Sequence, residues 1–206
     1  MKKINWGIIG LGTIADIFAN AFESSSAGKL IGLASKNTDK LDKFKNKYKI
    51  DQKYCFNSYE KLLSCDDIDI VYIALPNSLH YEWILKCIDS NKKILVEKPA
   101  TLNLNEIKNI EKYLKNKKVF FAEAFMYRFH PQILKVIEMV NNNEIGKVNF
   151  VESNFGVNIL TKLNIFGIKL MKKINEESRF YNKNLGGGAI LDLGCYPVSF
   201  STLIAS

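Results

Sequence analysis

Cysteine is scarce in this sequence, and its spacing excludes the sites that cysteines usually build. The four cysteines form no C-x-x-C pair and do not have the spacing of metal ligands. They are Cys55, Cys65, Cys87 and Cys195. A chain without disulfides is typical of a reducing compartment, so we expect a cytoplasmic protein with no metal site.

Long apolar runs are also lacking. The apolar run after Met1, Lys2 and Lys3 is short and is followed by a glycine-rich turn rather than a cleavage site. We therefore expect no export signal. We also expect no transmembrane span and no membrane partner.

Arginine and histidine are rare, at two residues each, although the formal net charge is +8. Nearly all of the 29 basic residues are Lys, and many lie along predicted helical faces at residues 40–49 and 108–118. No aromatic-basic pattern of a nucleic-acid reader accompanies them, so we interpret them as solvated surface and expect no nucleic-acid partner. A chain of 206 residues can form one large domain, or one domain and part of another.

Up to about residue 123, short β-branched runs alternate with longer stretches of helical periodicity. This alternation predicts βαβ units, and near-continuous apolar strands predict a sheet that is buried on both faces. We therefore expect an α/β fold with a doubly wound parallel (Rossmann) sheet over residues 1–123. The predicted strands begin at Ile4, Lys29, Lys53, Ile68, Lys92 and Lys118, and the predicted helices cover residues 41–48, 81–88 and 107–114.

The pattern changes after this point. Residues 131–140 predict a helix, residues 146–157 a longer strand, and residues 159–178 an irregular, partly helical insertion. Three consecutive glycines then precede an apolar helix. We expect residues 124–206 to be the start of a second, incomplete α/β domain, whose long strand would have exposed edges.

The first chemical motif is GLGTIA at residues 10–15, between a predicted strand and a predicted helix. In this context G-x-G-x-x-A predicts a dinucleotide site. Gly10 permits the tight turn, and Gly12 lets the backbone approach a pyrophosphate at the helix N-terminus. Thr13 and Ile14 are further candidate cofactor contacts. The alternative is a plain strand-to-helix turn.

The end of the second predicted strand lacks the acidic residue that would bind the ribose of NAD. Ser35, Lys36 and Asn37 stand there instead. A hydroxyl, a cation and an amide suit a 2′-phosphate better than a free ribose hydroxyl, so these residues favour NADP over NAD. Asp39 is near enough in sequence to keep NAD open.

Two further strand ends should lie at the same edge, where a doubly wound sheet holds its ligand. The second of them carries Glu97 and Lys98, which are candidate cofactor contacts, and Pro99 fixes the backbone directly after, so we expect Lys98 to face the cleft. The alternative is a surface lysine that happens to precede a proline. We expect His80 to cap or pack and also to contact the cofactor. The first of these two strand ends supplies the candidate cofactor contacts Leu75, Pro76, Asn77 and His80.

Five ordered blocks of the sequence resemble the Gfo/Idh/MocA oxidoreductases, and most of all their dihydrodiol dehydrogenase and glucose-fructose oxidoreductase branch. The blocks are GIIGLGTIA, DIVYIALPNSLHYEW, ILVEKPATLN, FFAEAFMYRFHPQ and LGGGAILDLGCYPVSF. The resemblance implies an N-terminal Rossmann domain and hydride transfer between a nicotinamide and a sugar-like or cyclic alcohol or carbonyl. Members of this family are much longer, so we expect a chain truncated at its C-terminus, with a homo-oligomeric full-length form.

The resemblance also implies catalytic roles. The family's E-K-P lysine matches Lys98, and its D-x-G-x-x-x-H signature matches in part, because Tyr196 stands four residues after Asp192. Tyr196 would be the proton donor or acceptor, with Lys98 as its partner, since a neighbouring ammonium group favours phenolate. Asp192 would orient the Lys or bind a substrate hydroxyl. Without the resemblance, Tyr196 is more simply interpreted as a core aromatic.

The two arginines, Arg128 and Arg179, both lie within motif blocks or beside them. Among so many lysines an arginine indicates a need for forked hydrogen bonding, so both are candidate substrate contacts, with a structural role as the alternative for Arg128. Two other functions of the same fold stay open. They are a non-catalytic dinucleotide-binding regulatory protein and a glycosidase that uses NAD catalytically.

Overall fold

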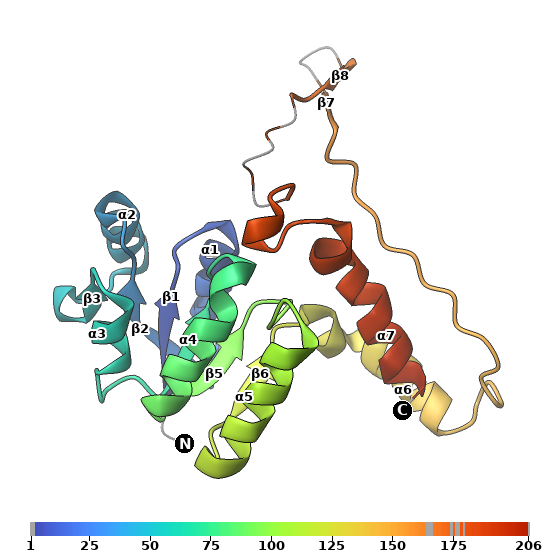
Figure 1. Cartoon of the computed structure of the whole chain (residues 1–206), viewed down its shortest axis with the longest axis horizontal. Helices are drawn as coiled ribbons and strands as arrows, with labels where there is room; N and C mark the ends of the chain where they lie inside the picture. The colour runs from blue at the N-terminus through green and yellow to red at the C-terminus, as the bar shows by residue number, and fades with distance from the viewer. Residues whose placement is uncertain (1–2, 164–166, 174, 176–177, 179, 206) are drawn as a thin grey trace. The chain divides into compact units, whose positions relative to one another are not determined.

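The computed structural model describes residues 3–163, 167–173, 175, 178 and 180–205. The chain divides into two compact units between Ala124 and Phe125, one residue from the boundary expected from the sequence. Figure 1 shows the elements of both units. Each unit is described by itself.

The first unit contains a six-stranded sheet in which every paired strand is parallel to its neighbour. The strand order β3-β2-β1-β4-β5-β6 places β1 at the centre, where the winding reverses direction. This is the doubly wound topology expected from the sequence, and each predicted strand is present. The strands are β1 (Ile4–Ile9), β2 (Gly28–Ala34), β3 (Cys55–Phe56), β4 (Ile70–Ile73), β5 (Lys93–Val96) and β6 (Phe121–Glu123).

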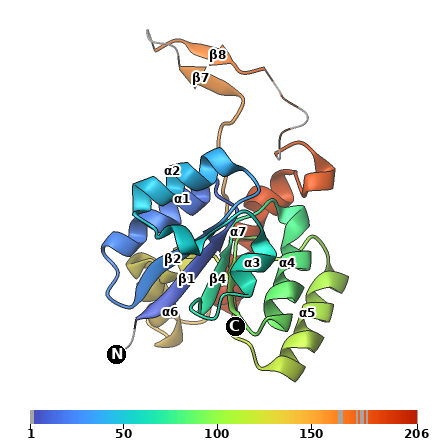
Figure 2. The same cartoon turned by 90° about the vertical axis from the view of Figure 1, so that its left-hand side faces the viewer.

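Helices cover both faces of this sheet, as Figure 2 shows. Along β1, Ile8 packs with residues of α1 and α2, whereas Ile9 packs with residues of α3, α4 and α5. Successive strand residues point to opposite faces, so a strand buried on both faces must be apolar throughout. The helices are α1 (Thr13–Asn20), α2 (Thr38–Tyr48), α3 (Tyr59–Leu63), α4 (Asn77–Asp89) and α5 (Leu104–Lys117), with short 3-10 helices η1 (Ala21–Glu23) and η2 (Gln52–Tyr54).

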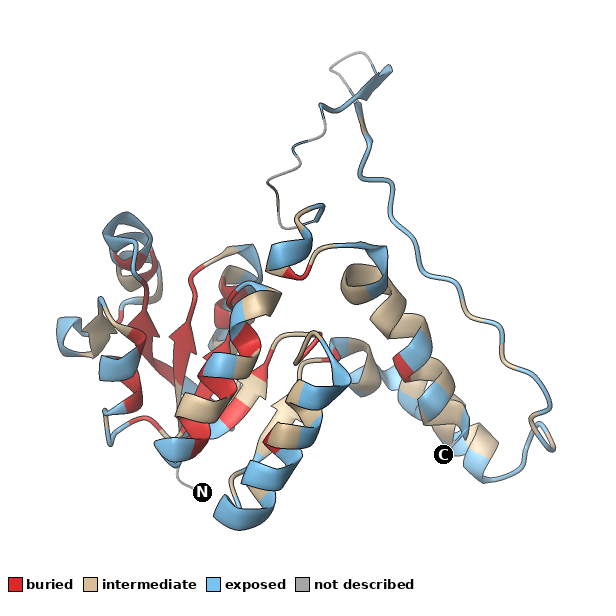
Figure 3. Cartoon of the chain, in the orientation of Figure 1, coloured by how far each residue is buried: buried red, intermediate tan, exposed pale blue. Residues whose placement is uncertain are grey.

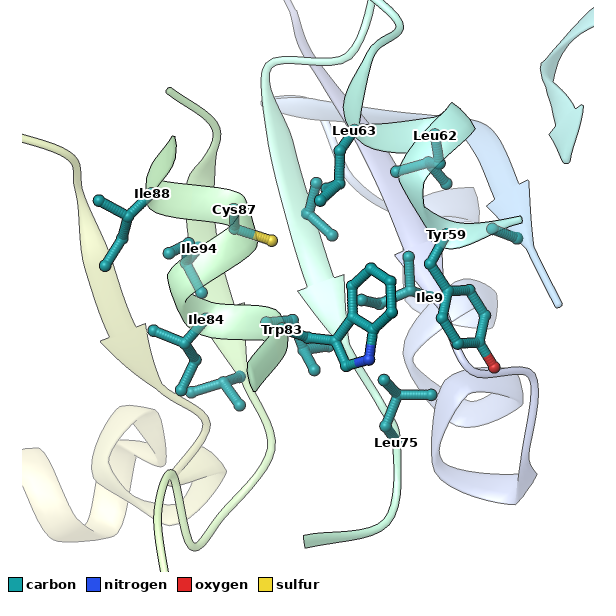
Figure 4. Packing of buried hydrophobic residues seen from close by; sticks show 14 of the residues in the cluster. Ile9, Tyr59, Leu62, Leu63, Leu75, Trp83, Ile84, Cys87, Ile88 and Ile94 are labelled. Atoms are coloured by element: carbon teal, nitrogen blue, oxygen red, sulfur yellow. The ribbon is translucent and has the colours of Figure 1, made fainter. Parts of the chain in front are cut away.

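The larger of the two core clusters of the first unit lies on the face that α4 covers. Figure 4 shows the indole of Trp83 beside Tyr59 and Leu75, and the Tyr59 and Trp83 rings meet edge to face at 4.9 Å. Ile84 and Ile88 of the same helix are completely buried. Burial of this kind stabilises a domain by roughly 1.5 to 3 kcal/mol per large apolar side chain, so α4 is held firmly on the sheet.

The second unit consists mainly of helices, a short hairpin and extended chain. Residues 147–159 form no strand, so the long strand expected over residues 146–157 is absent. A strand requires a pairing partner for its backbone groups, and the described residues supply none there. Its elements are η3 (Met126–Phe129), α6 (Pro131–Asn141), β7 (Thr161–Leu163), β8 (Lys169–Met171), η4 (Lys183–Leu185), η5 (Ile190–Gly194) and α7 (Cys195–Ala205).

Two further expectations for the second unit need correction. Within residues 159–178, the described part contains the antiparallel pair β7 and β8 and no helix, so the partly helical insertion was wrong. The helix after the glycines was predicted correctly, but its first turn, η5, is a π-helix. Figure 3 shows that most of the second unit is exposed or half-buried, whereas the strands of the first unit are largely buried.

One helical stretch, Lys183–Ala205, is long and apolar enough to cross a membrane by length and composition. Within it, an 18-residue window has a mean hydropathy of 1.3, and 6% of that window is buried. A single such helix is weak support for a span, because core helices of other proteins pass the same test. The expectation of no membrane partner therefore stays a prediction.

Candidate functional site

The glycine turn after β1 can be built only with glycine at its first position. Gly10 has φ +87°, and a Cβ added there would lie 2.6 Å from the carbonyl oxygen of Ala74. The Gly10 amide also donates a hydrogen bond to the carbonyl oxygen of Ala34, at 3.2 Å. The turn is thus packed against the ends of β2 and β4, and the ends of three neighbouring strands form one continuous edge.

Gly12 lies at the same turn for a different reason. It is the N-cap of α1, with φ −106° and no side-chain cap, and a Cβ added there would have nothing within 4 Å. Thr13 and Ile14, in the first turn of α1, are exposed. The N-terminus of α1 therefore offers backbone N–H groups at an open surface, and such a helix end attracts phosphate. These residues fit the pyrophosphate of a dinucleotide.

The loop after β2 is held by its own hydrogen bonds. Ser35 is buried and its Oγ accepts a hydrogen bond from the Asn37 amide at 3.1 Å. The Asn37 side chain caps α2 by accepting from the Lys40 amide at 2.9 Å. Lys36 is exposed, with Nζ 5.7 Å from the centre of the Tyr59 ring. Lys36 is therefore a cation presented by an ordered loop, as a 2′-phosphate contact requires.

The loop after β4 leads into α4 at its proline. Pro76 is the N-cap of α4 and Asn77 is already helical, so neither Asn77 nor Ser78 caps this helix. Pro76 has ψ 145°, which is not helical, so the helix begins at Asn77. Leu75 is buried and Pro76 is exposed. The cofactor contacts predicted for these residues stay predictions.

His80 is completely buried in the first turn of α4. Its Nδ1 lies 2.8 Å from the carbonyl oxygen of Pro99, and its Nε2 lies 2.9 Å from that of Leu75. Burial lowers the pKa of His80, and the two backbone contacts oppose this effect. The packing role considered for His80 agrees with this burial, whereas a direct cofactor contact stays a prediction.

The turn that carries Lys98 is braced by carboxylates on two strands. The Glu97 carboxylate accepts hydrogen bonds from the Tyr72 hydroxyl and from the Lys98 amide, the latter at 3.3 Å. Glu123, at the end of β6, accepts from the Ala100 amide through Oε1 at 2.8 Å. Lys98 itself is half-buried. The backbone of the turn is thus fixed from β4, β5 and β6 together.

Sequence reasoning missed two members of this arrangement, Tyr72 and Glu123. Tyr72 belongs to the predicted apolar strand that begins at Ile68, and it is only 1% exposed. A buried tyrosine hydroxyl nearly always finds a partner, so a polar residue at a neighbouring strand end was to be expected. For Glu123, the available signal was an acidic residue at the carboxyl end of a strand beside the Lys98 strand.

In the second unit, Tyr196 sits in a cluster of aromatic rings near the start of α7. Its ring centre lies 5.7 Å from that of Phe125, 6.0 Å from that of Tyr127 and 5.1 Å from that of Phe155. Tyr196 is half-buried, and Asp192 lies in the π-helical turn before it. Because Lys98 and Tyr196 belong to different units, their predicted pairing stays a prediction.

Arg128 is tied to α7 through a serine. Its Nη2 donates to Ser199 Oγ at 3.0 Å, and the Tyr127 hydroxyl donates to the same oxygen at 2.8 Å. The guanidinium also lies 5.7 Å from the centre of the Phe125 ring. These contacts agree with the structural role considered for Arg128, and its substrate contact stays a prediction. Arg179 lies outside the described residues.

Comparison with known proteins identifies the class to which this arrangement belongs. Residues 4–125 match the family profile described as oxidoreductase family, NAD-binding Rossmann fold, and residues 133–206 match the Gfo/Idh/MocA C-terminal domain. The chain therefore belongs to the Gfo/Idh/MocA oxidoreductase family, as its sequence blocks indicated.

Among its relatives is a trans-1,2-dihydrobenzene-1,2-diol dehydrogenase of Xenopus tropicalis, 31% identical over 201 residues, which cover 97% of this chain and 56% of the relative. A D-xylose 1-dehydrogenase (NADP(+)) of Haloferax volcanii is 36% identical over 148 residues, which cover 72% of this chain and 41% of the relative. The chain thus spans about half the length of these relatives.

A solved structure shows the same fold. It is a 3-ketoreductase from Actinomadura kijaniata in complex with NADP and TDP-benzene, with a TM-score of 0.78 and 26% sequence identity. The match covers 100% of this chain and 58% of that chain.

Proposed function

We propose that this chain carries the cofactor site and catalytic residues of an NADP-preferring oxidoreductase that acts on a sugar-like or cyclic alcohol or carbonyl. The single observation that carries the proposal is the continuous edge formed by the Gly10 turn, the Ser35 loop and the Lys98 turn. Along that edge the exposed cation follows β2, the open helix N-terminus follows β1 and the braced lysine follows β5. This order matches the adenosine ribose, the pyrophosphate and the nicotinamide half of an extended dinucleotide.

The residues have separate roles in this proposal. The nicotinamide dinucleotide, when bound, supplies or accepts the hydride. Tyr196 donates the proton to the developing alkoxide during reduction and removes it during oxidation. Lys98 favours the phenolate form of that tyrosine, and Asp192 holds the lysine or a substrate hydroxyl.

The preference for NADP rests on Lys36. It is the exposed cation at the end of β2, beside the first turn of α2, where the ribose 2′ position of a bound dinucleotide lies. Relatives named as NADP(+)-dependent D-xylose dehydrogenases support the same preference.

The test is a fluorescence titration of the purified chain with NADPH and with NADH at one fixed salt concentration. We expect saturable binding of both, with NADPH bound more tightly. Absence of binding by a chain that circular dichroism shows to be folded would refute the dinucleotide site. Equal affinity for both nucleotides would refute only the role of Lys36.

The proposal also includes the cellular location and the partners of this protein. The sequence has four cysteines and no C-x-x-C pair, which supports a reducing cytoplasm as the proposed location. The proposed partner is a small sugar-like molecule, with neither nucleic acid nor membrane, and a homo-oligomer is proposed for the full-length form.

A further inference from the structure

One peptide group in the Lys98 turn is held at both of its ends by side chains. The carbonyl oxygen of Pro99 lies 2.8 Å from His80 Nδ1. The amide of the next residue, Ala100, donates to Glu123 Oε1, also at 2.8 Å. These two groups belong to the same peptide unit, and the unit begins one residue after Lys98. Pro99 and Ala100 are both buried, so the grip is shielded from water.

The two contacts strengthen each other through the peptide. An N–H that donates to a carboxylate makes the carbonyl oxygen of the same peptide a better acceptor, and chains of hydrogen bonds in a dry interior gain from this polarisation. A neutral imidazole has one N–H, whereas His80 faces two carbonyl oxygens. The polarised oxygen of Pro99 is the stronger competitor for that proton, so the proton belongs on Nδ1.

We infer that His80 and Glu123 are positioning residues, which grip the Pro99–Ala100 peptide and so set the place of Lys98 and of the nicotinamide half of the cofactor. This inference rests on the proposed function. The glycine turn after β1 receives the pyrophosphate and the end of β2 the adenosine ribose, so the remaining half of the dinucleotide extends over β4 and β5. His80 and Glu123 act only on that half.

Because His80 and Glu123 act on one half of the cofactor only, two ligands can separate this effect from a general loss of stability. The ligand 2′,5′-ADP occupies the adenosine half alone, whereas NADPH occupies both halves. We expect His80→Leu and Glu123→Ala each to raise the Kd of NADPH about tenfold or more, and to leave the Kd of 2′,5′-ADP within about twofold. Glu123→Gln retains an oxygen acceptor for the Ala100 amide and should stay within about threefold of the unmodified chain.

Ile88→Ala is the matched control. Ile88 is completely buried on the same helix as His80, and its side chain has no polar atom that could hold the Lys98 turn by a hydrogen bond. Its removal should lower the thermal midpoint and leave the ratio of the two Kd values unchanged. The inference would be overturned if His80→Leu, while folded, weakened both ligands equally or neither.

A second measurement tests the hydrogen bond between His80 and the Pro99 carbonyl oxygen without any nucleotide. The chain has two histidines, so a nitrogen-15 histidine label gives two ring systems, which His80→Gln assigns. The second ring system belongs to His130, whose Nδ1 accepts a hydrogen bond from the Gln132 amide at 3.2 Å. We expect His80 at neutral pH to show a protonated Nδ1. An unprotonated Nδ1 on His80 would refute the grip on the Pro99–Ala100 peptide, even if the chain binds NADPH. Failure to bind either nucleotide would refute the proposed function, but it would not change the conclusion from the histidine spectrum.

Discussion

The two glycines of the turn after β1 should respond differently to the same substitution. In Gly10→Ala the new methyl group would lie 2.6 Å from the backbone oxygen of Ala74, and alanine would have to adopt φ +87°. The left-handed conformation costs about 1 to 2 kcal/mol, and forcing a methyl group into packed backbone costs about 1 to 3 kcal/mol. We therefore expect Gly10→Ala to lower the free energy of unfolding by about 2 to 5 kcal/mol.

Gly12→Ala should leave the fold intact. The methyl group would meet no protein atom within 4 Å, and φ −106° is open to alanine. The stabilisation that Gly→Ala gains through the unfolded state, about 0.4 to 1 kcal/mol, is offset by the poorer capping of α1 by alanine. Stability should then change by less than about 1 kcal/mol. NADPH affinity should fall at least about tenfold, because the methyl group occupies the space that the pyrophosphate needs.

Urea unfolding followed by circular dichroism and NADPH titration on the same preparations separate the two effects. Gly10→Ala should shift the urea midpoint downward by about 1 to 2 M, and Gly12→Ala should not shift it measurably. Normal NADPH binding by Gly12→Ala would show that no phosphate approaches this backbone. An unshifted midpoint for Gly10→Ala would show that the turn is not packed against Ala74.

Three further predictions concern single side chains. Lys36→Ala should raise the Kd of NADPH about tenfold and that of NADH by less than about twofold, as measured by fluorescence titration; equal losses would exclude a 2′-phosphate contact. Lys98→Met, and Tyr196→Phe in a chain with the full length of its relatives, should abolish turnover while NADPH affinity stays within about threefold; near-normal steady-state rates would exclude those roles. Burial lowers the pKa of His80, so below its unfolded pKa of about 6.5 only the unfolded chain takes up the proton. Stability should accordingly fall as the pH drops through 6.5 toward the folded pKa, and His80→Gln should flatten this part of the urea-unfolding profile; identical slopes would contradict the burial of a neutral ring.

The sheet and the loops at its ligand edge could be predicted because both depend on local signals. Strands buried on both faces leave continuous apolar runs, and parallel topology sends the carboxyl ends of neighbouring strands to one edge. Gly10 and Ser35 follow such runs directly, and Lys98 follows one after Glu97. Their common location therefore required no knowledge of which strands pair.

The braces behind Lys98 could not be predicted in this way, because each depends on contacts between distant residues. His80 reaches Pro99 across 19 positions, and Glu123 reaches Ala100 across 23. A histidine at the start of a helix and an acidic residue at a strand end have many local explanations. Only the order of β4, β5 and β6 brings them to the same peptide.

The expected strand over residues 146–157 shows why a local sequence signal can also predict an element that is absent. A helix satisfies its backbone hydrogen bonds within one segment, so α6 could be predicted from its own residues, and the structure confirms it as Pro131–Asn141. A strand satisfies them only through another segment, and apolar periodicity says nothing about whether that segment is near. Residues 121–123 have β5 beside them and pair, whereas residues 147–159 have no such neighbour among the described residues and remain extended chain. The same kind of sequence signal thus gave a correct strand in one unit and a wrong one in the other.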